Sequence, residues 1–261
     1  MGKVYLEPIK HEYINSESGR KYLSVTKFIH RFVNEFPAEQ IATNMARRHD
    51  ETRTKEDILA EWDENNKKAL EYGTSVHELL ERLLKAPGGI LFSKSKKEQE
   101  IIDAFNDINP ITSDRVYAER VLHLEKNGIA GTADVVEDFE DHFNIWDFKT
   151  NKQINFVDKY GKYMHSPVSH LSDCSYNTYA LQLSFYAYMY SRETGKSVGR
   201  LALLWLDRET NKFHMFPIPY LQKDVEALLE YDEMIKLATQ SRLSGYMSNL
   251  LLSNEKKHGS K

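Results

Sequence analysis

Two aspartates and a lysine in the middle of the sequence have types and spacing that suit metal-dependent chemistry. Asp134 ends the segment Gly131–Asp134, and Asp147 begins the segment Asp147-Phe148-Lys149. If both segments are strands of a hairpin that turns at Glu140-Asp141, Asp134 lies directly opposite Asp147. Two opposed carboxylates repel each other, and a divalent cation between them removes this penalty. Because carboxylate oxygens suit Mg²⁺ or Mn²⁺, the pattern predicts a site for one of these ions.

The acidic pair also has a structural interpretation. Asp134 and Asp147 would then be charges at a sheet edge, and Lys149, which shares a face with Asp147, would pair with one of them. For an isolated acidic pair, this interpretation would be preferred. The neighbours of Asp147 predict a buried strand, however, and they are Ile145, Trp146 and Phe148. Since buried acids need partners, the apolar surroundings favour the metal site.

Two further motifs stand in a fixed order around the acidic segments. Gly73–Glu78 lies upstream in a helical pattern, and Gln182–Tyr186 lies downstream on a second helix. With Gly131–Asp134 and Asp147-Phe148-Lys149, they resemble the motifs of the PD-(D/E)XK nucleases in their RecB-like exonuclease form. Each motif alone is weak evidence, but four in this order are specific. The group includes virus-encoded exonucleases, the mitochondrial genome maintenance exonuclease and the nuclease domains of RecB and AddB.

The resemblance implies a set of metal ligands. Asp134 and Asp147 would bind one or two ions through their carboxylates, and the backbone carbonyl of Phe148 would be a further ligand. His77 would bind the same centre from the helical region. Glu119 lies on an earlier strand, where some relatives carry an additional acidic ligand. Taken alone, His77 would be interpreted as a histidine packed on the core.

The resemblance also implies catalytic and DNA-binding roles. Lys149 would orient the attacking water and stabilise negative charge on the phosphate. Gln182 and Tyr186 lie four residues apart on one helix face, where they would steady the site and contact the DNA strand. Lys152 belongs to the loop at 151–177, whose basic and aromatic residues suit a strand-binding surface. Each of these residues also has a structural interpretation. Lys149 would form an ion pair with an aspartate, Gln182 and Tyr186 would belong to a helix core, and Lys152 would lie in a solvated loop.

The elements that must position these residues follow from the periodicity of the sequence. Thr54 and Asp57 have the spacing of a capping box at the start of a helix. In order, we expect a hairpin near 11–23, helices at 24–48 (interrupted at Pro37), from Thr54 to Pro87 (interrupted at Gly73-Thr74) and at 94–109, strands at 115–124, 129–137 and 143–150, a helix at 178–192, strands at 200–207 and 212–219, and a helix at 223–239.

This order of elements predicts an α+β (mixed α/β) fold. The resemblance narrows it to a restriction-endonuclease-like core, with a central mixed β-sheet flanked by helices and a helical N-terminal elaboration. We expect a single nuclease domain over residues 1–261. It would consist of a mainly helical part at 1–110 that carries His77, a βββ–α–ββ–α core at 111–240, and a disordered tail at 253–261.

Composition and missing motifs exclude several other classes of protein. The chain has 261 residues and one cysteine, Cys174, which rules out a disulfide framework and an iron–sulfur cluster. No G-x-x-x-x-G-K-[ST] motif is present, so no nucleotide cofactor is expected. A zinc-protease H-E-x-x-H motif fails because Glu81 stands in place of the second histidine. Without a signal peptide or a membrane-spanning segment, we expect a soluble, intracellular, cytoplasmic protein.

The sequence thus predicts a phosphodiester hydrolase, foremost a Mg²⁺- or Mn²⁺-dependent exodeoxyribonuclease with 5′-phosphate products. Its partner would be DNA, as single strands or duplex ends, in recombination, repair or viral DNA processing, and a virus in a bacterial host is one source that fits. Two alternatives stay open: a non-catalytic nucleic-acid-binding or assembly protein on the same fold, and a structure-specific endonuclease. The net charge of -4 does not itself favour a nucleic-acid partner. A homo-oligomer, a recombination partner protein and a helical arch over single-stranded DNA are also open.

Overall fold

The strands of the protein form one mixed sheet, with β4 attached as a branch. The structure is a computed structural model that describes residues 3–48 and 52–258. The strand order is β1-β2-β3-β5-β6-β7-β8, and β4 pairs with β5. The strands are β1 (Val4–Glu7), β2 (Glu12–Asn15), β3 (Lys21–Ser24), β4 (Arg115–Leu124), β5 (Ile129–Asp138), β6 (His142–Lys149), β7 (Ser197–Asp207) and β8 (Lys212–Ile218). The helices are α1 (Val25–His30), α2 (Ala38–Arg48), α3 (Lys55–Lys85), the short 3-10 turn η1 (Pro87–Gly89), α4 (Lys96–Ile108), α5 (Ser175–Thr194) and α6 (Gln222–His258).

β5 has three neighbouring strands, and this creates a fork in the sheet. On one edge β4 pairs with it from Ile129 to Asp138, with an interruption at Glu119. On the other edge β3 runs parallel to residues 129 and 130, whereas the ladder with β6 is antiparallel and begins only at Val135. β3 and β6 therefore diverge beside residues 131–134, which is the segment that ends in Asp134.

The hairpin of β5 and β6 has the predicted register. Val135 faces Trp146, and the ladder continues to Asp138 opposite Phe143. The backbone N–H of Phe139 then donates to the carbonyl of His142, so that the chain turns at residues 140 and 141. This register confirms that Asp134 and Asp147 stand at facing positions, one step beyond the last paired residues.

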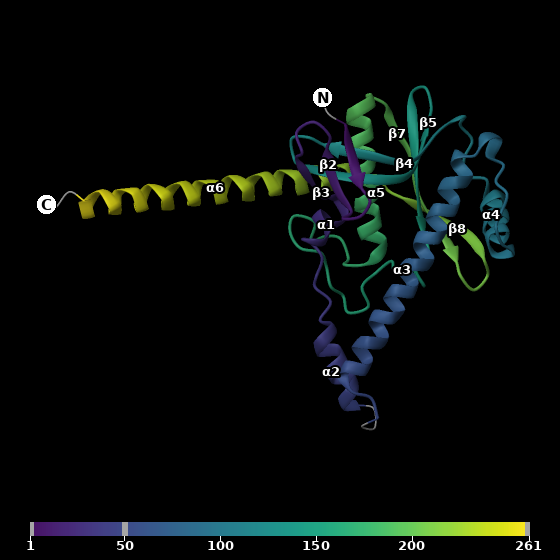
Figure 1. Cartoon of the computed structure of the whole chain (residues 1–261), viewed down its shortest axis with the longest axis horizontal. Coiled ribbons are helices and arrows are strands. Elements are labelled where there is room, and N and C mark those ends of the chain that lie inside the picture. Colours follow the sequence, from purple (N-terminus) through teal and green to yellow (C-terminus); the bar gives the residue numbers. More distant parts are fainter. Residues whose placement is uncertain (1–2, 49–51, 259–261) are drawn as a thin grey trace.

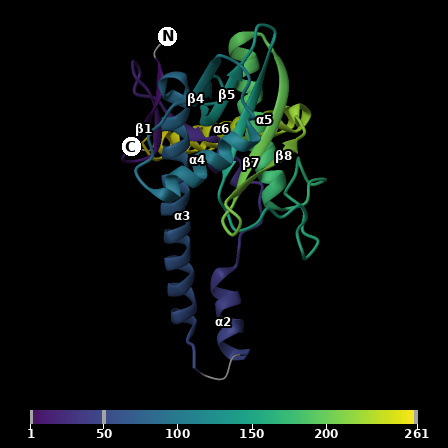
Figure 2. The same ribbon diagram turned by 90° about the vertical axis from the view of Figure 1, so that its right-hand side faces the viewer.

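Helices cover both faces of the sheet, and each face has its own apolar core (Figures 1 and 2). α1, α5 and the first turns of α6 lie on one face, where the largest buried side chains include Phe28, Leu181, Phe185 and Leu228. α3 and α4 lie on the other face, where Leu79, Leu80 and Phe105 belong to the same cluster as Trp146 and Phe148. This arrangement confirms the predicted α+β fold with a central mixed sheet between helices.

α2 and the first half of α3 form an arm that projects from the body (Figure 2). The ring of Phe36, just before α2, lies 5.9 Å from the ring of Trp62 on α3. Lys55 and Glu39 form an ion pair of 2.5 Å between the two helices. α3 begins with the predicted capping box, in which Thr54 and Asp57 bond each other's backbone N–H. The start of α3, at the far end of the arm, was therefore predicted correctly from the sequence.

The structure corrects the predicted break at Gly73-Thr74, because α3 continues through both residues. A single glycine costs a helix only about 1 kcal/mol, and packing at both ends of α3 offsets that cost. A Cβ atom at residue 73 would lie 3.1 Å from Oγ1 of Thr150, so glycine allows α3 to pass close to the end of β6. The first helical region is also shorter than expected. α1 ends at His30, and the backbone N–H of Asn34 donates to Asp173 in the loop before α5.

The two ends of the chain also differ from the expectation. The predicted hairpin near 11–23 is confirmed as β2 and β3, but the sequence did not predict β1, which pairs with β2. α6 continues to His258, so residues 253–258 are helical and correct the prediction of a disordered tail. Residues 259–261 lie outside the described part of the chain. Within the described ranges, no helix combines the length and the apolar character that a bilayer crossing needs.

Gly131 of β5 lies in close contact with Tyr186 of α5, and this contact gives a stability prediction. A Cβ atom there would lie 2.5 Å from Cε1 of Tyr186 and 3.1 Å from Cγ2 of Val25. Because both neighbours are buried, Gly131→Ala is expected to lower the free energy of unfolding by about 1–3 kcal/mol in urea titrations. Gly73→Ala is the comparison, and we expect a smaller loss there, because its Cβ would meet a single hydroxyl at 3.1 Å and a helix favours alanine. Equal stability of the two variants would contradict the close contact at Gly131.

Candidate metal centre and active-site cleft

Three side chains from three different elements meet beside the fork in the sheet. His77 of α3, Glu119 of β4 and Asp134 of β5 each place one ligand atom so that the three atoms lie within 4.8 Å of one another. Nδ1 of His77 is 3.5 Å from Oδ2 of Asp134. One histidine nitrogen and two carboxylates at this spacing form a donor set that a divalent cation can bridge.

A local departure from strand geometry accompanies Glu119. Its φ is 54°, which is uncommon for a residue with a side chain. The ladder of β4 and β5 pairs Ala118 with Val135 and Arg120 with Ala133, but it skips Glu119 and Asp134. The two acids therefore stand at facing positions without backbone pairing. From the sequence, Glu119 was the weakest candidate among the metal ligands. In the structure it is one of the three residues whose ligand atoms lie close together.

Asp147 and Lys149 form a second, deeper pair. Both side chains are largely buried on β6, and the ammonium of Lys149 contacts Oδ2 of Asp147. This ion pair is the structural interpretation that the sequence left open for Lys149. Apart from that ammonium, Oδ2 of Asp147 has no hydrogen-bond partner among the described residues. Asp147 is not a member of the group formed by His77, Glu119 and Asp134.

Phe148 connects the two groups. Its backbone N–H donates to Oδ2 of Asp134 at 2.7 Å, so the Asp134 side chain bonds the backbone where the ladder of β5 and β6 has ended. Its ring packs edge-on against the ring of His77 at 5.8 Å and against Phe105 at 5.8 Å. The middle residue of the Asp147-Phe148-Lys149 motif therefore orients two of the candidate ligands.

The charges of this site shift its pKa values in opposite directions. Burial alone would raise the pKa of Asp134, but His77, Lys149 and the Phe148 N–H outweigh it, so that the pKa is lowered. Burial lowers the pKa of His77, but the neighbouring Asp134 raises it by more. In the protein without metal, His77 and Asp134 thus favour a charged pair.

The other two acids are held closer to neutrality. Burial, reinforced by the charge of Asp134, raises the pKa of Glu119 to about 7. Burial raises the pKa of Asp147 to about 6, although Lys149 opposes this rise. Burial would lower the pKa of Lys149, but Asp147 and Asp134 raise it overall, so the ammonium keeps its proton. The three carboxylates outnumber the two cationic side chains of the site, His77 and Lys149, and a divalent cation fits this excess of acidic groups.

Gln182 and Tyr186 support the site from α5. Nε2 of Gln182 donates to the hydroxyl of Tyr186 at 2.9 Å. The Tyr186 side chain is 3% exposed and lies against Gly131, which leaves almost none of its surface for the predicted contact with DNA. Burial raises its pKa well above the ordinary value, and it stays a neutral phenol. Tyr186 is therefore a positioning residue behind the acids, whereas Gln182 is only half-buried.

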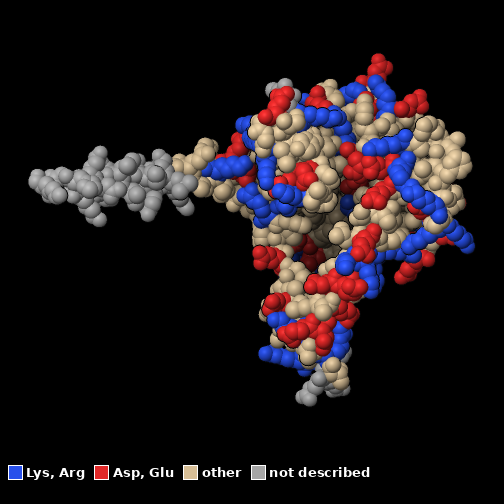
Figure 3. Space-filling view, in the orientation of Figure 1, with Lys and Arg blue, Asp and Glu red and all other residues tan. Residues whose placement is uncertain are grey.

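The metal group lines a cleft of about 560 Å³ between α3 and the end of β6. Figure 3 shows a hollow where the arm joins the body. Lys149 lines the cleft, as do two residues that the sequence analysis missed, Tyr179 and Arg208. The ammonium of Lys149 lies 4.7 Å from the centroid of the Tyr179 ring. Nε of Arg208 donates to the carbonyl of Thr150 at 2.5 Å. Parallel pairing of β6 with β7 brings Arg208 beside the end of β6, and that pairing is not visible in a local pattern.

Comparison with known proteins identifies the family. Residues 45–245 match the model of the PD-(D/E)XK nuclease superfamily. No curated protein matches the sequence. A solved structure described as the crystal structure of SSO0001 aligns with 17% identity, 64% coverage of this chain, 70% coverage of that chain and a TM-score of 0.26, a likeness too weak to support a conclusion. The family match spans most of the sequence, and the chain therefore belongs to the PD-(D/E)XK nuclease superfamily, whose members are metal-dependent nucleases.

The raised pKa of Glu119 predicts how the metal-free protein responds to pH. The folded state binds this proton more tightly than the unfolded chain, whose glutamates have the ordinary pKa of 4.5. The stabilisation is therefore complete at acidic pH and is lost as the pH rises through about 7. With a chelator present, we expect the Tm to fall by about 2–4 °C more in wild type than in Glu119→Gln as the pH is raised across this value.

Thermal melts at several pH values, followed by circular dichroism, would measure the slope. Glu17→Gln is the matched control, because Glu17 is exposed and far from the cleft. It should keep the slope of wild type. A slope that is unchanged by Glu119→Gln would show that this carboxyl is not the group that loses its proton.

Proposed function

We propose that this member of the PD-(D/E)XK nuclease superfamily is a Mg²⁺- or Mn²⁺-dependent exodeoxyribonuclease of the RecB-like group, with 5′-phosphate products. The observation that carries the proposal is the convergence of His77, Glu119 and Asp134 beside the buried Lys149–Asp147 pair, at the wall of an open cleft. DNA recombination, repair or viral DNA processing is the setting in which such an activity would be used.

His77, Glu119 and Asp134 would hold the cation, and Asp147 with the backbone carbonyl of Phe148 would complete its ligands. When bound, the cation neutralises the phosphodiester, lowers the pKa of a bound water and stabilises the leaving oxygen. The chain's own contribution is to fix the ligands in advance. The Phe148 N–H holds Asp134, and the Phe148 ring holds His77. Metal binding would also favour the ionised forms of Glu119 and Asp147.

Lys149 would supply the positive charge that the transition state needs. Its ammonium is held between Asp147 and the ring of Tyr179, and its raised pKa keeps it protonated. Because the Lys149 side chain is itself largely buried, its ammonium is held in a fixed position and stabilises developing negative charge more strongly than a fully hydrated ammonium would. Lys149 is therefore the residue proposed to orient the attacking water and to bind the reacting phosphate.

DNA contacts outside the centre would come from the loop that follows β6. Lys152 is exposed at the start of this loop. Further along, Tyr160 is 73% exposed, and the ammonium of Lys159 lies 4.9 Å from its ring centroid. An ammonium beside an exposed ring can bind a phosphate and stack a base of one strand. Gln182 is the proposed contact on the side of α5.

The position of the arm supports an exonuclease. α3 borders the cleft along slightly more than three turns, from Ala69 and Leu70 to Glu81. Leu70 is 72% exposed and Phe36, at the base of the arm, is 67% exposed. Exposed apolar side chains at this place suit contact with unstacked bases of a single strand better than contact with the sugar-phosphate backbones of a duplex. A strand end could enter beside the arm, whereas a continuous duplex that approaches from the side would meet the arm first.

Substitution of the central residues tests the enzyme. We expect Lys149→Met and Asp134→Asn to lower the rate of degradation of labelled DNA by ~100-fold or more with Mg²⁺ or Mn²⁺, while the circular dichroism spectrum stays that of wild type. Lys223→Met is the matched control, since Lys223 is an exposed lysine of α6 that does not line the cleft. Chelation with EDTA should abolish all activity. If Lys149→Met degrades DNA as fast as wild type, the activity comes from a contaminant and the non-catalytic alternative gains support.

A comparison of linear and circular single-stranded DNA of one sequence tests the exonuclease assignment. An exonuclease needs an end, so we expect the linear form to be degraded at least ~10-fold faster than the circle. Oligonucleotides blocked at one end or the other would then give the polarity. Cleavage of the circle at the rate of the linear form would overturn the exonuclease assignment in favour of an endonuclease.

A further inference from the structure

α6 extends far beyond the body that anchors it. Its first turns are buried through Val225, Leu228 and Leu229, and the carboxylate of Asp232 forms ion pairs with Arg31 and Lys236. After Asp232 the helix leaves the body and projects alone (Figure 1). Apolar side chains on its described projecting part are exposed: Met234 by 68%, Ile235 by 42% and Leu237 by 63%.

A helix that projects in this way has no packing contacts of its own to stabilise it. A helix gains most of its stability by packing an apolar face, and short isolated helices are marginal in water. The 37 residues of α6 span roughly 55 Å at 1.5 Å per residue. The exposed apolar residues of the projecting part therefore call for a partner surface.

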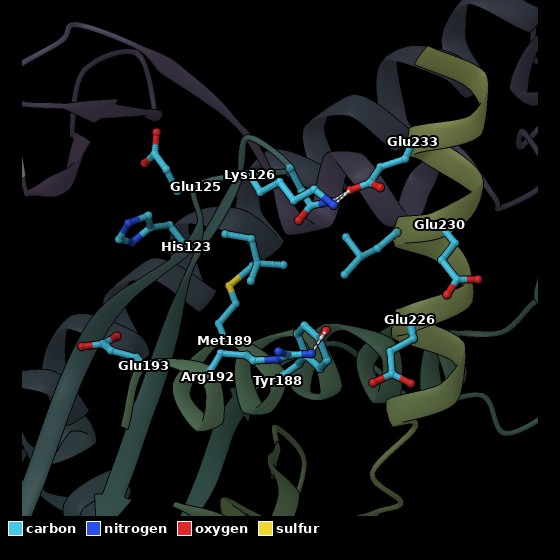
Figure 4. Close-up of a pocket in the computed structure, with 13 residues that line it drawn as sticks. His123, Glu125, Lys126, Tyr188, Met189, Arg192, Glu193, Glu226, Glu230 and Glu233 are labelled. Atoms are coloured by element: carbon cyan, nitrogen blue, oxygen red, sulfur yellow. Dashed lines mark hydrogen bonds and ion pairs between the residues drawn. The ribbon is translucent and has the colours of Figure 1, made fainter. Parts of the chain in front are cut away.

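A groove opens beside the root of α6. It has a volume of about 760 Å³ and is bounded by α5, α6 and the turn between β4 and β5. Its apolar lining comes from Leu124, Met189 and Leu229, and the ring of Tyr188 lies beside them. Figure 4 shows glutamates around this groove, among them Glu226, Glu230 and Glu233 along one side of α6.

Two of these glutamates form no ion pair with a described residue, although Arg192 also lines the groove. Glu233 pairs with Lys126, and Glu193 pairs with Arg120. Glu226 instead accepts a hydrogen bond from the neutral amide of Gln222, and Glu230 makes no hydrogen bond or ion pair with the described residues. An acidic rim with an apolar lining fits a segment that carries both apolar and basic residues. It does not suit nucleic acid, because the glutamates would repel phosphates.

We propose that this groove binds the distal end of α6 from a second copy of the chain, so that two copies associate through antiparallel α6 helices. The last turns of α6 have the composition that the groove calls for, because Leu250-Leu251-Leu252 is followed by Lys256-Lys257. The root and the tip of one helix therefore carry complementary charges, and an antiparallel pair brings each root to the other's tip.

The spacing along α6 agrees with this pairing. Glu226, Glu230, Glu233 and Leu237 follow one another at intervals of four, three and four residues, so they form one stripe of the helix. The stripe begins at the groove and continues onto the exposed projection. With a two-fold axis near Ser241, Lys256 of the partner subunit lies at the level of Glu226. The same contact then occurs twice, as a closed dimer requires.

Sedimentation of the full chain tests the dimer, independently of any nuclease activity. We expect wild type to sediment as a dimer at concentrations on the order of 10 µM. Glu226→Lys combined with Glu230→Lys, and separately Lys256→Glu combined with Lys257→Glu, should each weaken the dimer by ~10-fold or more through like-charge contacts. Glu17→Lys combined with Glu209→Lys is the matched control, because both residues are exposed elsewhere, and it should remain dimeric.

A mixture of the two charge-reversed variants distinguishes this pairing from misfolding. One variant has a basic groove and a basic tip, and the other has an acidic groove and an acidic tip. An equimolar mixture should therefore form a heterodimer in which both contacts are attractive. A monomeric wild type, or a dimer that neither reversal weakens, or a mixture that stays monomeric would overturn the proposal. None of these outcomes would alter the case for the nuclease, because the substituted residues lie outside the cleft.

Discussion

The crowding of three carboxylates beside the fork of the sheet is the constraint on which the site depends. Glu119, Asp134 and Asp147 stand at facing positions on three neighbouring strands, where their charges repel one another. His77 and Lys149 neutralise only part of that charge, because each is held mainly by a single aspartate. The remaining charge appears as the raised pKa values of Glu119 and Asp147. A divalent cation would remove the repulsion, so the same feature that strains the metal-free protein provides its affinity for metal.

The surrounding fold is arranged so that this crowding cannot relax. β3 and β6 diverge beside residues 131–134, and the backbone N–H of Phe148 is bonded by a carboxylate instead of by a strand. From one face α3 passes close to β6 because residue 73 is glycine, and from the other face Tyr186 of α5 fills the space above Gly131. Close packing on both sides holds the candidate ligands in place, and for the same reason a larger side chain at Gly73 or Gly131 would collide with its neighbours.

Two helical extensions project from the body, and only one of them borders the cleft. The arm formed by α2 and α3 borders the cleft and offers exposed apolar side chains where a strand would enter. α6 leaves the body in a different direction from the arm, to the left in Figure 1, and its root lies beside the groove lined by Glu226, Glu230 and Glu233. The cleft proposed for DNA and the groove proposed for a second copy are both lined by acidic residues, so the two proposals depend on a bound cation in the cleft and on basic residues of the partner subunit at the groove.

The sequence by itself determined the features that depend on local pattern. The strand period and the turn length fixed Asp134 opposite Asp147, and motif order placed the chain in its nuclease family. Only the tertiary structure decided the rest. The fold gives Glu119 a left-handed backbone conformation and brings its side chain to His77 and Asp134. It also buries Tyr186 against the sheet and continues α3 as one helix through Gly73. These outcomes depend on contacts between segments far apart in the chain, where packing overrides local preference and where no single segment contains the information.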